Sequence, residues 1–560
     1  MYKYEYSQSI AEEVYYSMAK FITAAEAAEL IPDGATIGVA GMGLSGFPEE
    51  VVCAIRDRFK ATGHPCNLEL HQGSAMGDWG VGNEYDGWDL TKRETPLDVK
   101  EAGSRGLSRL GEAGPGLVTK WYGAHVGSAF ALRDLAANNQ LQSWCLPQGI
   151  AVSIWREIAA GRPGLLSKVG LGTFVDPRME GGRMNQCTEG NVAELVEFDG
   201  EEYLYYKSFP LQVALLRGTI ADENGNISFM NEGILNEGLA VAAAAHNSGG
   251  IFIVQVQYLT KNDTIPPKDV KIPGILVDYV VEAQDPMSCW QTEGRYFEPA
   301  FSGQIRRPMG AIPAIPLSER KVIARRCAAE VQEGYVLNLG VGMSADVGSI
   351  LAEEGYIDRV TMCCESGMIG GVPCALPNFG SSYNPEAVVE QSNSFDIITG
   401  GGLNMTCLGM GECDEDGNVN VSKFGPRLTG PGGFIDITSA TPKVVFCGTF
   451  MGKAKLQIGD GKLTILQEGK VRKLLKSVEQ ITFAGKQIRP DQDVLYVTER
   501  CVMKPIDGKM TIIEIAPGID LEKDILAQMD FVPAVAEDLK TMDPGMFCEQ
   551  WGGLGKYFER

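Results

Sequence analysis

The sequence predicts an α/β protein built from two tandem, related open α/β domains in one chain, and three observations carry this prediction. Its 560 residues are about three to four times the length of a typical domain, so at least two cores are expected. Short apolar runs of strand length alternate with helical stretches, which is typical of sheets covered by helices. Stretches of the first half also recur in the second half. We therefore expect each half to form a parallel or mixed sheet wrapped by helices.

The clearest recurrence surrounds two glycine-rich turns. Residues 33–43 read DGATIGVAGMG, and residues 333–343 read EGYVLNLGVGM. Each turn follows an Ala- and Glu-rich stretch, 24–30 or 324–331, for which we expect a helix, and each precedes a further helix. This spacing predicts a duplicated unit.

A second recurrence is DENGNIS at 222–228 and DEDGNVN at 414–420. Asn and Gly between β-rich flanks predict a hairpin in both places. A calcium loop at 414–420 is the alternative. It is weak because Val419 stands where such a loop needs Gly and no Glu closes it.

These recurrences divide the chain into a first domain at 1–285, a linker at 286–317 and a second domain at 318–560. The linker is rich in Pro, Gly and aromatic residues and lacks a helical period, so we expect it to run extended along both domains. Strand-like runs support a sheet in each domain; they lie at 250–256, 444–448 and 494–497.

The composition excludes several function classes. With 44% hydrophobic and 22% charged residues, the chain is typical of a globular enzyme. Its net charge of −23 argues against nucleic-acid and membrane-surface partners. No apolar run is long enough to span a membrane and the start does not resemble a signal peptide, so we expect a cytoplasmic protein. The 14 Cys form no C-x-x-C pair and only four His are present, so we predict no metal site.

Two glycine patterns raise the question of a dinucleotide site. Gly41-x-Gly43-x-x-Gly46 fits the dinucleotide fingerprint, and residues 340–345 carry a version that ends in Ala. Such a site needs an acid at the end of the next strand. The strand expected at 66–70 is followed by no acid, whereas the strand after the second loop leads to Glu365. An NAD-binding oxidoreductase therefore has to be weighed.

The residues after Glu365 favour a different role for it. A second glycine-rich run, SGMIGGVP at 366–373, follows directly. Glycines let a substrate or another backbone approach closely, which suits a carboxylate that reacts. No Lys or Arg lies between Thr361 and Val421, so we expect neutral donors around the carboxylate. The alternative is an ordinary surface Glu in a loop.

Five segments complete the pattern, in chain order: LPQG at 146–149, GLGTFVDPRMEGGRMN at 170–185, NLG at 338–340, ESGMIGG at 365–371 and GGFID at 432–436. The pattern resembles the family I CoA-transferases, specifically the single-chain acetate/propionate CoA-transferase group. The stretch at 73–121 departs from it, because it is longer than the resemblance leads us to expect.

The resemblance implies a CoA-transferase-like fold with the active site at the interface of the two domains. It implies reversible, ping-pong transfer of CoA from an acyl-CoA to a short-chain acid of the acetate, propionate, butyrate or lactate type. Glu365 would attack the thioester and carry CoA as a glutamyl-CoA thioester. CoA is then a substrate, no tightly bound cofactor is expected, and a homo-oligomer, dimer or tetramer, is implied.

The resemblance and the glycine turns also supply candidate binding residues. For the oxyanion and acyl pocket they are Gly41, Met42, Gly43, Gln148, Gly432 and Gly433. For CoA they are Asn338, Gly340, Val341, Gly342, Gly401, Gly402, Leu403 and Asn404. The glycines could instead serve only as tight turns. Two other activities stay open, an acyl-CoA hydrolase on the same scaffold and the NAD-binding oxidoreductase.

Overall fold

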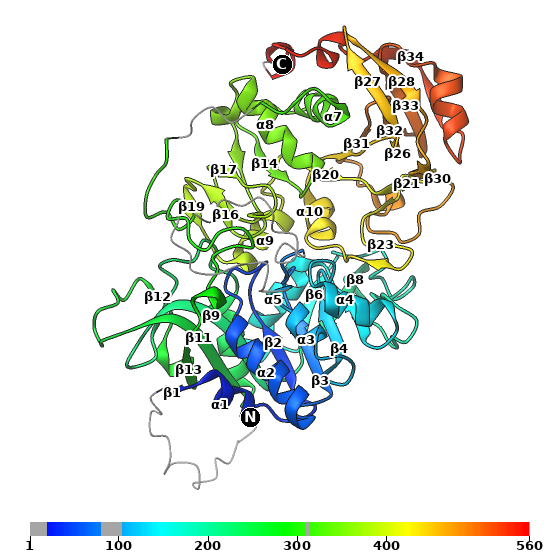
Figure 1. The fold of residues 1–560 in the computed structure, drawn as a ribbon. Helices are drawn as coiled ribbons and strands as arrows, with labels where there is room; N and C mark the ends of the chain where they lie inside the picture. Colours follow the sequence, from blue (N-terminus) through cyan, green and yellow to red (C-terminus); the bar gives the residue numbers. More distant parts are fainter. Residues whose placement is uncertain (1–18, 80–103, 309–313, 559–560) are drawn as a thin grey trace.

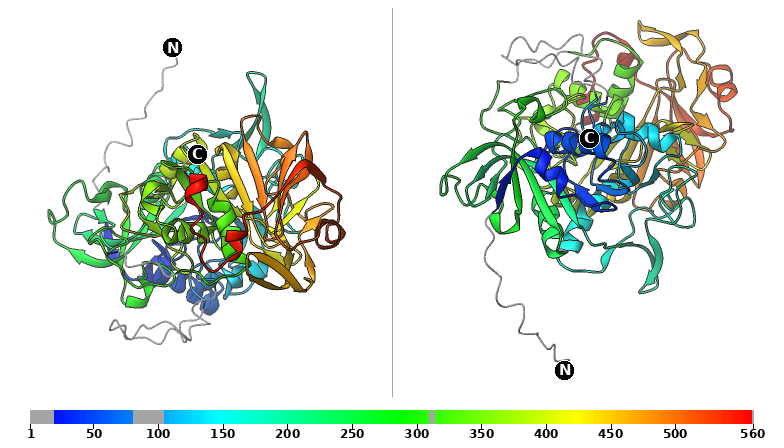
Figure 2. Two further views of the ribbon diagram at one scale, coloured as in Figure 1. Left: turned by 90° about the horizontal axis from the view of Figure 1, so that it is seen from above. Right: turned by 60° about the horizontal axis from the view of Figure 1, so that its bottom comes forward.

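Two large sheets, one from each half of the chain, organise the protein (Figure 1). The structure is a computed structural model that describes residues 19–79, 104–308 and 314–558. In the right-hand view of Figure 2, the blue helices and strands of the first half come forward and the orange and red elements of the second half lie behind. Among the described residues, no helix is long and apolar enough to cross a membrane.

The first sheet has the strand order β1-β13-β11-β9-β2-β3-β4-β5, and all neighbours on this path are parallel. The strands are β1 (Lys20–Ile22), β2 (Thr36–Val39), β3 (Leu68–Gln72), β4 (Val118–Gly123), β5 (Gln142–Cys145), β9 (Val213–Asp222), β11 (Ile251–Thr260) and β13 (Tyr279–Glu282). Short antiparallel additions are β10 (Ile227–Ser228) and β12 (Val270–Ile272), and a separate sheet contains β6 (Gly164–Ser167), β7 (Glu194–Phe198) and β8 (Glu201–Lys207).

The helices of the first half are α1 (Ala24–Glu29), α2 (Glu49–Thr62), α3 (Ser108–Gly111), α4 (Phe130–Ala137), α5 (Gln148–Ala159) and α6 (Gly238–Asn247). Helix α2 shows why these segments are helical. Val51, Val52 and Ile55 form a buried stripe at helical spacing, and Gly63 ends the helix at a φ of 79°.

The second sheet has the order β15-β14-β20-β25-β31-β32-β33-β34; it is parallel from β15 to β31, antiparallel through β33 and parallel again at β34. The strands are β14 (Val336–Leu339), β15 (Thr361–Met362), β20 (Met405–Gly409), β25 (Lys443–Cys447), β31 (Asp493–Val497), β32 (Cys501–Ile506), β33 (Lys509–Ile515) and β34 (Ala534–Thr541). The helices are α7 (Glu319–Ala328), α8 (Asp346–Glu353), α9 (Gln391–Thr399), α10 (Phe434–Ala440) and α11 (Gly555–Phe558).

Short strands border the second sheet: β16 (Met368–Ile369), β17 (Val372–Pro373), β18 (Ser382–Tyr383), β19 (Ala387–Val388), β21 (Glu412–Asp414), β22 (Val419–Asn420), β23 (Lys423–Phe424), β24 (Arg427–Leu428), β26 (Met451–Gly452), β27 (Lys455–Gly459), β28 (Lys462–Gln467), β29 (Val471–Arg472) and β30 (Leu474–Leu475).

The two sheets repeat one strand order. The path β3-β2-β9-β11-β13 of the first corresponds to β15-β14-β20-β25-β31 of the second. The register also corresponds, because Thr36 pairs with Glu69 just as Val336 pairs with Thr361. The duplication predicted from the glycine turns therefore has a structural counterpart.

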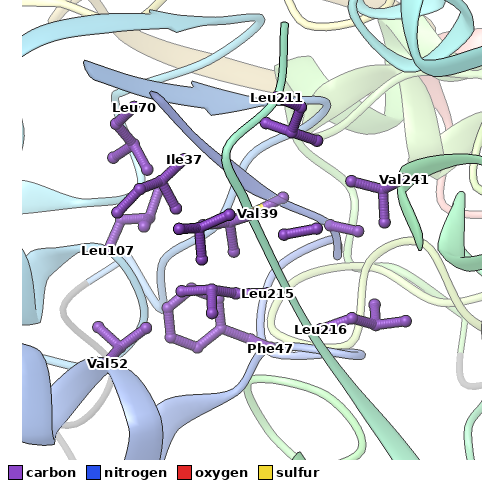
Figure 3. Packing of buried hydrophobic residues seen from close by; sticks show 14 of the residues in the cluster. Ile37, Val39, Phe47, Val52, Leu70, Leu107, Leu211, Leu215, Leu216 and Val241 are labelled. Atoms are coloured by element: carbon purple, nitrogen blue, oxygen red, sulfur yellow. The ribbon is translucent and has the colours of Figure 1, made fainter. Parts of the chain in front are cut away.

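Each half also has its own core. One cluster runs from Ala19 to Val281 and adds Leu428 and Ile435, and a second runs from Val322 to Phe558 and adds Val152. Figure 3 shows side chains of the first core packed together around β2. The cores support the two-domain division, whose boundaries stay a prediction.

Most of the expected elements are present, with two differences. Both hairpins are confirmed: β9 pairs with β10 and β21 pairs with β22, in antiparallel register. Helix α7 begins earlier than the predicted 324–331, at Glu319. Strand β15 has only two residues because the chain turns directly after it.

Candidate active site

Glu365 lies on a tight turn that follows β15. The Gly367 amide donates to the Cys364 carbonyl at 3.0 Å, and the Cys364 amide donates to the Met368 carbonyl at 2.9 Å. Gly367 has a φ of 102°, and a Cβ added there would lie 2.0 Å from the Val389 carbonyl oxygen. Glycine is therefore required, and it allows the turn to present Glu365 at the tip of the strand.

Neutral groups hold the Glu365 carboxylate. Its Oε2 accepts a hydrogen bond from Asn338 Nδ2 at 3.2 Å and one from Cys364 Sγ at 3.6 Å. Thr406 Oγ1 lies 3.3 Å from Asn338 Oδ1, which fixes the orientation of the amide. The side chain of Glu365 is buried; burial raises the pKa of Glu365 and the Asn338 amide partly offsets that rise. The absence of basic residues from the neighbouring sequence predicted this environment.

Glu365 opens into a cavity of about 410 Å³ that both halves line. The first half contributes residues from the ends of β2, β3, β4 and β5, and the second half contributes those from the ends of β14, β20 and β25. Carboxyl ends of parallel strands are the usual place for a ligand in an open α/β sheet. The predicted location between the halves is thus where the cavity lies.

Eight predicted site residues line this cavity: Met42, Gly43, Gln148, Gly340, Val341, Glu365, Gly432 and Gly433. Gly41 and Gly342 each neighbour a lining residue along the chain, and Asn338 lies behind Glu365 as its donor. Gly41 and Gly342 are therefore next to the cavity wall along the chain but do not line the cavity themselves.

Three residues predicted for the oxyanion and acyl pocket have backbone amides that are already hydrogen-bonded. The amides of Met42, Gly43 and Gly432 donate to the carbonyls of Ser45, Ala75 and Ala124. Because these N–H groups already have acceptors, Met42, Gly43 and Gly432 can shape the pocket but are poor oxyanion donors.

Gln148 is the stronger donor candidate. It begins α5 and is buried, and its Nε2 has no hydrogen-bond partner within the described ranges. Gln148 lines the cavity, and a buried amide that lacks a protein partner there is a candidate donor to a ligand oxygen.

The structure does not bring Gly401, Gly402, Leu403 and Asn404 to this cavity. They precede β20, whereas the cavity lies at the opposite end of that strand, at Leu408 and Gly409. Leu403 is in the core, and Asn404 Oδ1 accepts from the Val336 amide at 2.7 Å. Their predicted role in CoA binding is therefore corrected to a structural one, because their glycine-rich turn serves the entry to β20.

Several cavity residues were not singled out as site residues. Glu293 comes from the predicted linker, and burial raises its pKa to about 8. Burial lowers the pKa of His125 to about 4, and its ring lies 4.9 Å from that of Trp79. Lys473 also lines the cavity. No spacing in the sequence marks these residues, because the fold brings them in from distant segments.

Trp79 belongs to the long stretch 73–121 that departs from the family pattern. The structure describes that stretch up to Trp79 and again from Ser104, and the intervening part lies outside the described residues. Trp79 lines the cavity, so this end of the stretch contributes to the site.

The sequence of this chain is similar to those of known CoA-transferases. Residues 99–283 match the family described as Coenzyme A transferase. Caffeate CoA-transferase of Acetobacterium woodii is 61% identical over 96% of this chain and 99% of its own length. Acetate CoA-transferase YdiF of Escherichia coli O157:H7 is 38% identical over 94% of this chain and 95% of its own length.

Solved structures give the same result for the fold. The acyl-CoA transferase YdiF apoenzyme from Escherichia coli O157:H7 superposes with a TM-score of 0.86, at 38% identity, over 96% of this chain and 98% of that chain. A YdiF structure described as a thioester complex with CoA has a TM-score of 0.84 at 37% identity and covers the same shares of the two chains. Together with the cavity and its buried carboxylate, these relatives show that the chain belongs to the coenzyme A transferases, enzymes that move CoA from an acyl-CoA to a carboxylic acid.

Proposed function

We propose that this CoA-transferase works through a covalent glutamyl-CoA thioester on Glu365. The observation that carries the proposal is a buried carboxylate that is held by neutral donors and opens into the cavity between the two halves. The thioester complex with CoA described for the YdiF relative supports it.

The mechanism begins when the Glu365 carboxylate attacks the carbonyl carbon of the acyl-CoA. The C–S bond breaks, CoA leaves as a thiolate, and an acyl-glutamyl anhydride forms. The thiolate then attacks the glutamyl carbonyl, which releases the first acid and leaves the glutamyl-CoA thioester. The second acid runs these steps in reverse.

The site supplies what these steps need. Poor hydration keeps the carboxylate reactive, because few donors have to be displaced when it attacks. Each tetrahedral intermediate carries an oxyanion, and the amide of Gln148, a cavity-lining residue whose Nε2 lacks a protein partner in the described part of the chain, is the proposed donor to it. One well-placed donor of this kind contributes about 3–4 kcal/mol to the transition state. Closure by both halves limits the access of water, which would hydrolyse the anhydride.

We further propose that the acid can carry an aromatic ring, as caffeate does. The relative at 61% identity is a caffeate CoA-transferase. The cavity of this chain is lined by four aromatic side chains besides His125: Trp79, Phe379, Phe424 and Phe434. Rings of this kind favour a flat aromatic acid over acetate. The short-chain acids that the sequence predicted are then weaker substrates, which a comparison of kcat/KM for caffeate and acetate tests.

Intact mass measurement tests the covalent step. Enzyme mixed with acyl-CoA alone is expected to gain the mass of CoA on the peptide that contains Glu365, and the Glu365→Gln variant is expected to gain none. A CoA adduct of equal yield on Glu365→Gln would contradict the proposal. Loss of acyl-CoA at full rate without an acceptor acid would indicate the hydrolase instead.

We also infer that the enzyme is cytoplasmic and a homo-oligomer, a dimer or tetramer, as the family resemblance implies. Light scattering of the purified protein tests the oligomer, and a monomer at working concentration contradicts it.

A further inference from the structure

Three cysteines that are distant in the sequence meet beside the active-site cavity. Cys327 lies on α7, Cys407 on β20 and Cys447 on β25. The three Sγ atoms all lie within 4.8 Å of one another, and those of Cys407 and Cys447 are 3.8 Å apart. We call these three residues the thiol cluster.

The sheet explains how the cluster forms. Strands β20 and β25 are parallel neighbours, and Cys407 is paired with Val445 while Gly409 is paired with Cys447. Cys407 and Cys447 are therefore two positions apart in register, so their side chains point to the same face of the sheet. Helix α7 packs against β25 and places Cys327 over that face.

The cluster is buried next to the active-site cavity. All three residues belong to the second core, and Cys447 also lines the cavity that contains Glu365. The cavity is therefore the side from which an ion and a fourth ligand, such as water, would come.

The sulfur spacing fits one metal ion. In a tetrahedral zinc site the Zn–S distance is about 2.3 Å, which places two sulfurs about 3.8 Å apart. Thiolates are soft ligands and select zinc or monovalent copper over magnesium or calcium. We propose that Cys327, Cys407 and Cys447 bind one thiophilic metal ion, with its fourth coordination position facing the CoA-transfer cavity.

Metal binding converts the thiols of the cluster into thiolates, and their protons pass to the solvent. The bound cation then offsets the negative charge of the sulfurs in the buried core. Lys473, which lines the same cavity as Cys447, adds a positive charge on that side.

A titration with Cd²⁺ tests the proposal, because cadmium–thiolate bonds absorb in the ultraviolet. Fully reduced, chelator-treated enzyme is expected to show sulfur-to-metal absorbance that rises linearly and saturates at one equivalent. Zn²⁺ is expected to displace the signal. Cys327→Ala and Cys407→Ala are expected to weaken binding by at least about tenfold, because loss of even an outer-shell partner of a metal ligand has an effect of that size.

Cys501→Ala is the matched control. It removes a fully buried sulfur from the same core but outside the cluster, so it is expected to bind Cd²⁺ as the parent enzyme does. No thiolate absorbance from the parent enzyme with the first equivalent would overturn the proposal. Equal weakening in Cys501→Ala and Cys327→Ala would do the same. The cadmium–thiolate absorbance does not depend on CoA transfer, so this test of the metal site is valid whatever role Glu365 has.

Discussion

The two halves of this protein share one strand order but place a buried acid at different points of it. Counting on from the corresponding strand pairs, Gly73 occupies in the first half the position that Glu365 occupies in the second. By the same count, Gly38 corresponds to Asn338. The first half therefore has neither the carboxylate at the strand tip nor the amide that holds it.

The acid of the first half comes from a helix instead. Glu237 precedes α6 just as Gly433 precedes α10. A Cβ added to Gly73 would lie 2.6 Å from Glu237 Oε1, so the carboxyl of Glu237 occupies the space beside that glycine. In the first half the strand is followed by Gly73 and the helix is preceded by Glu237. In the second half the acid, Glu365, follows the strand and a glycine, Gly433, precedes the helix.

The difference teaches what makes a buried carboxyl reactive. Burial raises the pKa of both acids, to about 8 for Glu237. In the described part of the chain only backbone amides, those of Glu237 itself and Gly41, offset the rise in the pKa of Glu237; no side chain donates to it, and Glu237 does not line the active-site cavity. Glu365 has both the Asn338 donor and the cavity. Both acids are buried, so burial does not distinguish them. What distinguishes Glu365, the proposed nucleophile, is its opening into the cavity and the neutral side-chain donor Asn338.

Exchanging each acid for its amide should separate the two roles most strongly. Glu365→Gln is expected to lower the rate of CoA transfer by at least about 10⁴-fold, because the nucleophile is lost. Glu237→Gln is expected to stay within about threefold of the parent enzyme at pH 7, since it lies outside the cavity. Steady-state rates with saturating acyl-CoA measure both. Equal losses in the two variants would contradict the distinction.

The stability of Glu237→Gln should depend on pH. Below about pH 4.5 the Glu237 carboxyl is protonated in both folded and unfolded chains, so it contributes no difference. Between about pH 4.5 and 8 the unfolded chain ionises while the folded chain keeps its proton, so stability falls as pH rises. Removing the acid removes this penalty, by no more than about 5 kcal/mol at pH 8.

Thermal unfolding midpoints from pH 5 to 8.5 measure that effect. The midpoint of Glu237→Gln is expected to rise relative to the parent as pH increases. An offset that is constant with pH would reflect only the packing of the new amide, and it would show that Glu237 ionises normally in the folded protein.

Asn338→Gly gives the second half the residue of the first. Loss of the amide removes a hydrogen bond to a charged group, worth about 1.5–3 kcal/mol, so kcat/KM should fall by about 10- to 100-fold. Because Asn338 lowers the pKa of Glu365, the acid limb of the pH profile should also move to higher pH.

Asn404→Gly is the control for that shift. It removes an amide that bonds the start of β14, far from the cavity, and should leave the acid limb in place. If both variants move the limb alike, Asn338 acts only through the stability of the strand.

Sequence reasoning identified the parts of this site that local chemistry specifies. The glycines after Glu365, the apolar strands and the hairpin turns each act within a few residues, so their patterns are visible in the chain. Glu293 and the thiol cluster depend on which strands become neighbours, which no short pattern encodes. The glycine-rich turn at 401–404 was predicted to bind CoA, but it leads into the start of β20, whereas the cavity lies at the end of that strand.

The smallest effect is expected where the two halves meet at the surface. Arg156 of α5 and Asp396 of α9 form a two-pronged ion pair, with both N–O distances at 2.8 Å. Both side chains remain partly exposed, so Asp396→Asn should cost less than about 1 kcal/mol, and less still in high salt. Thermal midpoints at low and high salt measure this, and the CoA-transfer rate should not change. A tenfold loss of rate would instead show that this pair controls how the halves close over Glu365, because a purely stabilising contact would leave turnover of the folded enzyme unaltered.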